Sequence, residues 1–319
     1  MPAIADKHSD FLNEERRMKD EELTMIIHYP IHEVSEYINW IYFFHAWGFQ
    51  PRFATIADMH GCDACRATWL ASFAEENRPK AAEAMQLFKE ANRMLNALDA
   101  DYHTHAVFLL AEANGDGDDL LLNGTRFPLL RQQAAKRKEN EPFLCLSDFV
   151  RPLSSGQKDK VGAFATTVDA ALEQLYAADD YRRMLVQTLS DRLAEATAER
   201  LHEDVRRNFW GYAPDERLSI KELHYEKYQG IRPAVGYPSL PDQSVNFILD
   251  QLLDMKQIGI TLTENGMMQP HASVSGLMFA HPASCYFSVG KIAQDQLADY
   301  ASRRGMSLEK AKKFLAANL

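Results

Sequence analysis

The stretch EKYQGIRPAVGYP, residues 226–238, is the most informative segment of the sequence. Its two prolines fix the backbone φ angle and its two glycines permit tight turns, so Arg232 and Tyr237 are held on a stiffened loop. A rigid loop that presents one guanidinium suits bidentate capture of a carboxylate. The simpler alternative is a turn with an arginine on the surface, and a matching partner elsewhere in the chain would decide between the two.

Working outward from this loop, helical periodicity precedes it and short elements follow it. Apolar residues at three- and four-residue spacing predict a long helix over 168–209. After the loop we expect a helix at 244–255, strands at 261–263, 272–280 and 286–289, and helices at 294–303 and from Ser307. Long irregular segments such as the one at 210–241 are commonly functional.

The first half of the chain predicts helices and then strands. We expect one aromatic-rich helix at 33–47 and two helices between 62 and 100, broken near 77–79. Strands are predicted at 106–111, 119–122, 143–146 and 161–167, the first two joined by a hairpin. This order favours an α+β fold with a largely antiparallel sheet. Residues 1–32 look like a charged, poorly packed lead-in, and 33–319 like one domain.

Composition excludes several classes of function. The 319 residues hold 35 Lys+Arg against 45 Asp+Glu, so the net charge of −10 disfavours binding to nucleic acid. The N-terminal region is charged where a signal peptide would be apolar, and the richest apolar stretch, 38–49, is too short to span a bilayer. With four cysteines, too few for a disulfide scaffold, we expect a cytoplasmic protein that does not associate with membranes.

Two short motifs raise the question of a metal. Cys62 and Cys65, with His60 two residues before, could begin a zinc site, but no second ligand pair lies near them in the sequence. We therefore favour two cysteines at a helix start with one packed inward. Glu199 and His202 match half of a di-iron site, yet a second copy of that motif is missing. No metal is predicted.

The polar stripe around that second motif has a simpler interpretation. We expect it to form a solvated or partner-facing helix edge. The stripe comprises Arg192, Glu195, Glu199, His202 and Arg206. The sequence also lacks the glycine-rich dinucleotide fingerprint, the P-loop and the nucleophile elbow, so dinucleotide oxidoreductases, NTPases and α/β-hydrolases lose their usual support.

Matching segments recur in order along most of the chain. They are residues 37–40, 147–150, 162–165, 193–202, 210–212, 229–237, 272–276 and 305–307. Together these segments resemble the C-terminal reactivation domain of cobalamin-dependent methionine synthase. The resemblance implies a C-shaped α+β domain with a bent, largely antiparallel sheet flanked by long helices, in agreement with the layout expected above.

The resemblance also implies a function. In that family the domain binds S-adenosylmethionine and docks over the cobalamin module. After oxidation to inactive cob(II)alamin, an electron from flavodoxin or an equivalent donor and a methyl group from S-adenosylmethionine restore methylcobalamin. Such a chain would be a methyltransferase component, incomplete without a cobalamin-binding partner, since cobalamin supplies the chemistry and the protein supplies positioning.

Position by position, the resemblance assigns contacts to the ligand. Arg232 would hold the methionyl carboxylate, and the backbone near Ala234 would meet the adenine. Tyr286 and Phe287 would line the other side of the ligand. A carboxylate, an ammonium and a flat purine require an arginine, an acceptor and a π or backbone surface, which these residue types provide.

Further positions follow from the same comparison. Tyr237 would take part in catalysis by reaching toward the corrin face, while Glu195 and Glu226 would lie near the docking surface, among the cofactor-binding positions. The family has Asp where this chain has Asn39, which keeps a neutral acceptor for the ligand's ammonium but loses a charge-assisted bond worth about 1 kcal/mol. An insertion at roughly 53–77 has no role in the family pattern.

Our leading hypothesis is a free-standing reactivation component. The resemblance covers no homocysteine-, folate- or corrin-binding module, so the chain would act only with a separate corrinoid protein. One alternative is a non-catalytic module that binds S-adenosylmethionine or a corrinoid protein, which Asn39 favours. The other is a reactivase of a different corrinoid methyltransferase, with the insertion setting the choice of partner.

Overall fold

A computed structural model describes residues 15–19, 22–59, 61–133 and 141–319. Its centre is a seven-stranded sheet in which every pairing is antiparallel. The strands are β1 (Glu15–Lys19), β2 (Glu22–Pro30), β3 (His103–Asp116), β4 (Asp119–Leu122), β5 (Thr125–Pro128), β6 (Asp159–Val168) and β9 (Ser273–Met278). A separate two-stranded ribbon joins β7 (Thr261–Leu262) and β8 (Met268–Gln269).

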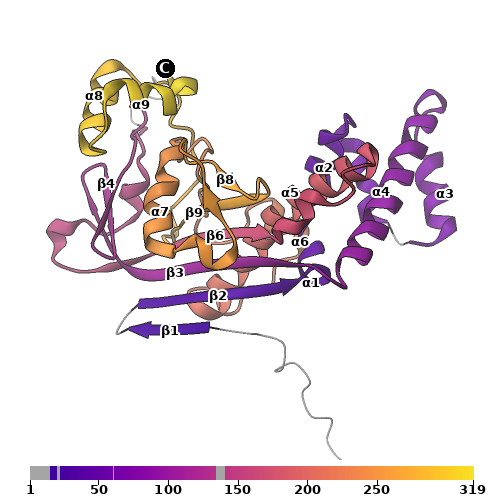
Figure 1. Ribbon diagram of the computed structural model, residues 1–319, viewed down its shortest axis with the longest axis horizontal. Coiled ribbons are helices and arrows are strands. Elements are labelled where there is room, and N and C mark those ends of the chain that lie inside the picture. Colours follow the sequence, from indigo (N-terminus) through magenta and orange to yellow (C-terminus); the bar gives the residue numbers. More distant parts are fainter. Residues whose placement is uncertain (1–14, 20–21, 60, 134–140) are drawn as a thin grey trace, which may run out of the picture.

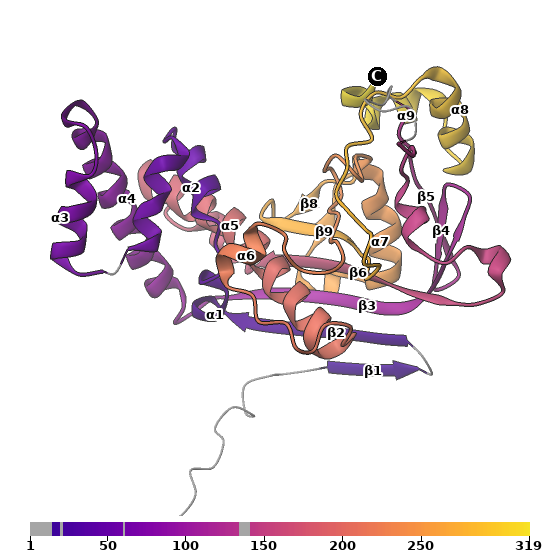
Figure 2. The same ribbon diagram turned by 180° about the vertical axis from the view of Figure 1, so that it is seen from behind.

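Helices rise from both ends of this sheet, which gives the molecule its C shape (Figure 1). The helices of the molecule are α1 (Ile31–Ser35), α2 (Trp40–Ala46), α3 (Asp63–Ala71), α4 (Arg78–Leu98), α5 (Asp180–Asp204), α6 (Ile220–His224), α7 (Asn246–Leu253), α8 (Gln294–Arg303) and α9 (Leu308–Phe314), and α7 lies over the middle of the sheet (Figure 1). Figure 2 shows α2, α3 and α4 grouped beyond one end of the sheet, and α8 and α9 over the other. The expected fold class is confirmed.

The central strand β3 explains why the sheet is covered on both faces. Residues 106–111 are all buried, and their side chains alternate between two cores because successive residues of a strand point to opposite faces. Phe108 and Leu110 pack in the core that includes α4 and α5, whereas Val107 and Leu109 pack in the core that includes α7. An uninterrupted apolar strand is the signature of this two-sided burial.

The lead-in predicted over residues 1–32 is wrong for its second half. Strand β2 pairs with β3 along residues 23–30, and Met25, Ile27 and Tyr29 are buried against the helices. The alternation of these apolar residues with more polar ones is a period-two strand pattern that the surrounding charges obscured. Residues 1–14 lie outside the described part of the chain.

Several predicted boundaries also change. The helix expected at 33–47 is two helices, because the chain turns at 36–39 before Asn39 caps α2. The long helix expected from residue 168 begins at Asp180, where the Asp179 side chain accepts a hydrogen bond from the N–H of Arg182 at 3.0 Å. The preceding residues complete β6 and a short 3₁₀ turn, Ala170–Gln174.

Two predicted strands, 143–146 and 286–289, are loops in the structure. In the second, the N–H groups of Phe287 and Val289 donate to the Ser239 hydroxyl and the Pro238 carbonyl. The backbone partners are thus supplied by the proline-rich loop and not by a neighbouring strand. The remaining predicted strands and helices are present, with ends shifted by a few residues. No helix among the described residues has the length and apolarity needed to cross a membrane.

The informative loop lies against β9, and a glycine permits that approach. Residue pairs Ile231–Phe279 and Ala234–Gly276 form isolated antiparallel bridges. A Cβ atom at residue 276 would lie 2.3 Å from the Pro233 carbonyl oxygen and 2.9 Å from the Ala234 Cα. Only glycine therefore fits at position 276, because both of these neighbouring atoms belong to the backbone and cannot rotate away.

Gly276→Ala should lower the free energy of unfolding by about 1–3 kcal/mol, because the new methyl group overpacks the contact between the loop and β9. Chemical denaturation measures the change. Gly61→Ala is the matched control, since the nearest atom to its added Cβ would be Arg66 Nη2 at 3.8 Å. If both variants keep the wild-type stability, the close packing described here is incorrect.

Candidate functional site

A cavity of about 610 Å³ opens between α5, the start of α2, the loop at 226–239 and residues 286–288. Its lining includes all eight side chains that the sequence singled out. They are Asn39, Glu195, Glu226, Arg232, Ala234, Tyr237, Tyr286 and Phe287. The structure thus brings together residues that are up to 248 positions apart in the sequence, and the predicted site residues share one cavity.

The innermost feature of the cavity is a buried ion pair. Arg232 Nη2 lies 3.0 Å from Glu199 Oε2, and the two side chains are only 11% and 12% exposed. Burial alone would lower the pKa of Arg232, but the carboxylate of Glu199 and two neighbouring tyrosines raise it overall, so the guanidinium stays charged. The arginine predicted from the sequence as a carboxylate-binding group already has one carboxylate partner.

The ion pair leaves two buried atoms without partners. Arg232 Nη1, a donor, and Glu199 Oε1, an acceptor, make no hydrogen bond with any residue that the structure describes. A buried polar atom without a partner costs about 1–3 kcal/mol. A ligand that carries both an anionic and a cationic group can satisfy the two atoms at once. An amino-acid carboxylate and ammonium are such a pair of groups.

Backbone and tyrosine contacts hold Arg232 in place. Its N–H donates to the Tyr286 hydroxyl at 2.9 Å, and that hydroxyl lies 3.3 Å from the hydroxyl of Tyr228. Two residues earlier, Gly230 has a φ of +89° and lies so close to β9 that a Cβ would meet the Phe279 carbonyl oxygen at 2.4 Å. The stiff loop expected from the sequence is therefore anchored on both sides of its arginine.

Ala234 lines the site, and backbone contacts fix its position. It pairs with Gly276, but the cross-strand bonds are made by its neighbours, from the Val235 N–H to Ser275 O and from the Leu277 N–H to Pro233 O. Its own carbonyl accepts from the Tyr237 N–H at 3.2 Å. Within the described chain the Ala234 N–H has no partner and is available to a ligand.

Acidic and tyrosine side chains form the outer part of the cavity. Tyr237 is 52% exposed, and its hydroxyl donates to Glu195 Oε1 at 2.6 Å. Burial and the nearby Glu195 raise the pKa of Tyr237, so the phenol remains protonated. Glu226 has a left-handed φ of +56°, and burial together with Glu199 raises the pKa of its carboxyl.

Asn39 has two tasks. Its side-chain oxygen accepts a hydrogen bond from the Ile41 N–H at 3.2 Å and so caps α2. The same side chain lines the cavity, where its amide nitrogen has no hydrogen-bond partner among the described residues. The position therefore contributes to the helix start and to the ligand-binding surface.

The sequence did not identify Glu199 and Tyr228 as site residues. The interpretation of the polar stripe as a solvated helix edge is wrong for three of its five residues. Glu199, His202 and Arg206 are buried. The Arg206 guanidinium stacks on the Tyr228 ring at 4.2 Å and pairs with Glu216 at 2.9 Å. Their spacing indicated one helix face, but nothing in the sequence of the helix shows that the loop covers this face.

Among the described residues, no group of three or more His, Cys, Asp or Glu side chains could hold a metal ion. His202 is fully buried, and neither of its ring nitrogens has a hydrogen-bond partner. His60, which was considered together with Cys62 and Cys65 for a zinc site, lies outside the described residues.

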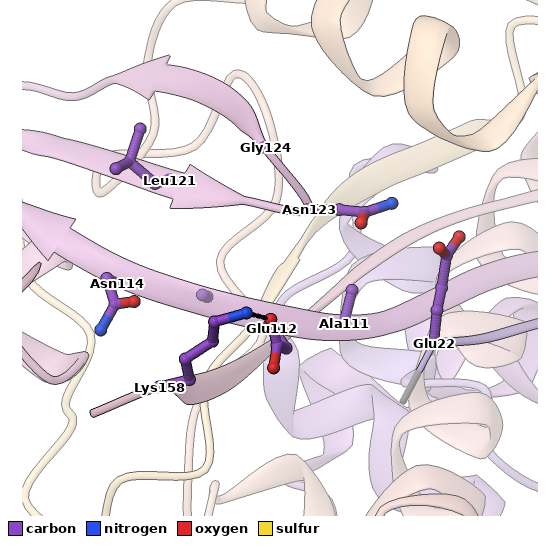
Figure 3. A pocket seen from close by; sticks show the side chains of 9 residues that line it. Glu22, Ala111, Glu112, Asn114, Leu121, Asn123, Gly124 and Lys158 are labelled. Carbon is purple, nitrogen blue, oxygen red and sulfur yellow. Dashed lines mark ion pairs between the residues drawn. The ribbon is translucent and has the colours of Figure 1, made fainter. Parts of the chain in front are cut away.

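A second hollow, of about 220 Å³, differs in character. It lies beside β3 and β4 and is lined mainly by polar groups, including Glu22 and the ion pair between Lys158 and Glu112 (Figure 3). None of the predicted site residues lines it. The larger cavity, with its aromatic walls and unpaired buried atoms, is the better candidate for a ligand site.

A curled antiparallel sheet with flanking helices, and a cavity between a helix and a loop, define an α+β domain with a candidate ligand site. Comparison with known proteins identifies the family. The family model described as "Vitamin B12 dependent methionine synthase, activation domain" matches residues 30–305 of this chain. The chain therefore belongs to the family of activation domains of vitamin B12-dependent methionine synthase, as the resemblance in the sequence indicated.

A solved structure agrees with this assignment. The crystal structure of the MetH reactivation domain bound to AdoHcy superposes with a TM-score of 0.80 at 39% sequence identity. The match covers 93% of this chain and 90% of that one. At this identity and coverage, the similarity extends over the whole fold described above.

His202 should make the stability pH-dependent. Burial, and then Arg206 and Arg232, lower its pKa far below 6.5, so below that pH only the unfolded chain takes up the proton. The free energy of unfolding should therefore fall as the pH drops. His202→Phe keeps the contact with Tyr228 and removes this effect, so wild type should lose about 1 kcal/mol relative to the variant between pH 6.5 and 5.5.

Urea unfolding of both proteins at several pH values measures this difference. Because Glu226 and Asp204 titrate in both proteins, their contributions cancel in the comparison. Parallel stability curves for the two proteins would show that His202 is able to accept a proton in the folded state.

Proposed function

We propose that this chain binds S-adenosylmethionine in the 610 Å³ cavity and acts as a free-standing reactivation component of cobalamin-dependent methionine synthase. The observation that carries the proposal is the pair of unpartnered buried atoms, Arg232 Nη1 and Glu199 Oε1. They match the carboxylate and the ammonium of the methionyl group. The similar reactivation domain bound to AdoHcy, a molecule with the same amino-acid end, supports this choice of ligand.

The remaining contacts follow from the chemistry of the ligand. The free N–H of Ala234 would meet the adenine, which carries several acceptor nitrogens. Tyr286 and Phe287 would line the opposite side, and an aromatic ring beside a sulfonium gains a cation–π interaction of about 0.5–2 kcal/mol. Glu199, which the sequence did not identify as a site residue, would bind the ligand's ammonium. In the family, an aspartate at the position of Asn39 binds that group.

The outer residues would serve the partner protein. Tyr237 is exposed at the rim, so it is placed to reach a corrin that docks over the opening. Glu195 orients its hydroxyl, and Glu226 adds a second carboxyl near the same opening. Cobalamin, held by the partner, would accept the methyl group after an electron arrives from a flavodoxin-like donor, and this chain would supply binding and orientation. We expect the reaction to take place in the cytoplasm.

Two observations favour alternative functions. Asn39 in place of the family aspartate fits a module that binds the ligand or a corrinoid protein without supporting turnover. The segment 53–77, which forms α3 and its flanking turns, fits a reactivase that serves a different corrinoid methyltransferase. Binding without methylation would select the first alternative, and methylation confined to another corrinoid protein would select the second.

Arg232→Lys should weaken binding of S-adenosylmethionine roughly tenfold or more, because lysine keeps the charge beside Glu199 but cannot hold both carboxylates with separate nitrogens. Isothermal titration calorimetry measures this affinity. Reconstitution with a methionine synthase cobalamin module, a reductant and S-adenosylmethionine should show return of methylcobalamin with wild type and much less with the variant.

Arg192→Lys is the matched control, since Arg192 also lines the cavity but forms no ion pair with a described residue and lies over the Tyr42 ring at 5.9 Å. It should change the affinity less than about threefold. Thermal unfolding confirms that both variants fold. Wild-type affinity in Arg232→Lys, or no methylcobalamin in the complete wild-type mixture, would contradict the proposed function.

Asn39→Asp should strengthen binding of S-adenosylmethionine by about 1 kcal/mol, roughly fivefold in Kd, because it adds a charge-assisted bond to the ammonium. Aspartate caps helices as well as asparagine does, so α2 should be unaffected. Calorimetry and circular dichroism test the two statements separately. An unchanged Kd would mean that residue 39 does not contact the ammonium.

A further inference from the structure

Two thiols meet at the start of α3, more than 150 residues before the cavity-lining loop in sequence. Cys62 is the N-cap of this nine-residue helix, and its Sγ accepts a hydrogen bond from the Cys65 N–H at 3.2 Å. The Cys62 thiol donates to Cys65 Sγ, with the two sulfurs 2.8 Å apart. No disulfide joins them in this structure, and their sulfurs lie within 1 Å of the S–S bond length of about 2.05 Å.

Neither thiol is packed inward, contrary to the interpretation favoured from the sequence. Cys62 is exposed and Cys65 is half-buried. The other two cysteines differ, since Cys145 is buried with its pKa raised to about 11 and Cys285 is exposed without a second thiol beside it. Among the described cysteines, only the α3 pair combines accessibility with a neighbouring sulfur.

The geometry makes the two thiols unequal. The contact between the two thiols, and then backbone N–H groups, lower the pKa of Cys62, whereas the same contact raises the pKa of Cys65. A helix N-terminus stabilises a thiolate further. Cys62 is therefore the attacking thiol in any exchange reaction, and Cys65 is placed to act second.

A cavity of about 420 Å³ is lined by residues that flank the two cysteines in sequence and by basic residues of α4. Gly61 and Arg66, which flank the two cysteines in sequence, line it together with Lys89 and Arg93 of α4. Within the described chain, Arg66 pairs with Asp63 at 3.2 Å, whereas Lys89 and Arg93 form no ion pair and carry the unneutralised charge of this cavity. The apolar side of the cavity comes from Ile56, Met59, Met85 and Phe88. Such a surface attracts a small anionic molecule with an apolar part.

We propose that Cys62 and Cys65 form a reversible intramolecular disulfide by exchange with a small anionic disulfide of the glutathione class. The Cys62 thiolate attacks one sulfur of the external disulfide, forming a mixed disulfide and releasing the first thiolate. Cys65 then loses its proton, attacks Cys62 Sγ and displaces the second thiolate. Two electrons pass from the dithiol to the external disulfide, which leaves as two thiols. This site is independent of the proposed reactivation function.

Incubation of the full chain with oxidised glutathione, followed by alkylation and peptide mass analysis, tests the pair. Wild type should lose two alkylatable thiols at 62 and 65 without retaining glutathione. Cys65→Ser should instead accumulate glutathione on Cys62. Cys62→Ser should react with oxidised glutathione at no more than about one tenth of the wild-type rate. Cys285→Ser is the control and should behave as wild type at the α3 pair.

Charge is tested with a second probe. Lys89→Gln should slow the reaction with oxidised glutathione roughly two- to fivefold at low salt and leave the reaction with neutral hydroxyethyl disulfide unchanged. Stable glutathione on Cys62 in wild type, or no bond between 62 and 65 at any ratio of oxidised to reduced glutathione, would overturn the dithiol site. Equal slowing of both probes would overturn the anionic class of the substrate.

Discussion

The ion pair between Arg232 and Glu199 is the interaction on which the cavity depends. Two buried charges are tolerated only when they neutralise each other, so α5 and the loop at 226–238 must meet at one distance. The tyrosines at 228 and 286 and the tight contact of the loop with β9 maintain that distance. Arg232 uses one terminal nitrogen and Glu199 one oxygen in the ion pair. The pair therefore leaves one donor and one acceptor for a ligand.

This arrangement explains why the cavity lies where helices meet the curled sheet. Strand β9 supplies a flat edge for the loop, and α5 crosses the same face with its polar side turned toward the arginine. Two cores hold the sheet between them, one under α4 and α5 and one under α7. The loop is therefore fixed on a surface that cannot move without disturbing both cores.

Much of the site could be predicted from the sequence, because the loop residues constrain their own backbone and the resemblance to reactivation domains implied the other positions. Pro233, Gly230 and Gly236 constrain the chain locally, so Arg232 could be recognised as a binding residue before any fold was known. The burial of Glu199 and His202 could not, since a helix face carries no sign of what covers it. Strand β2 and the loop at 286–289 were misjudged for the same reason, because their partners are distant in sequence.

Asn39 shows how a fold limits the residues that one position of a binding site can accept. Its oxygen is committed to the start of α2 while the side chain also faces the cavity, so a replacement has to satisfy a helix and a ligand together. Serine and threonine would cap the helix with a shorter side chain that withdraws from the cavity, and glutamine or glutamate would not cap it. Of these residues, only asparagine and aspartate can therefore replace each other and change ligand binding without a loss of helix stability.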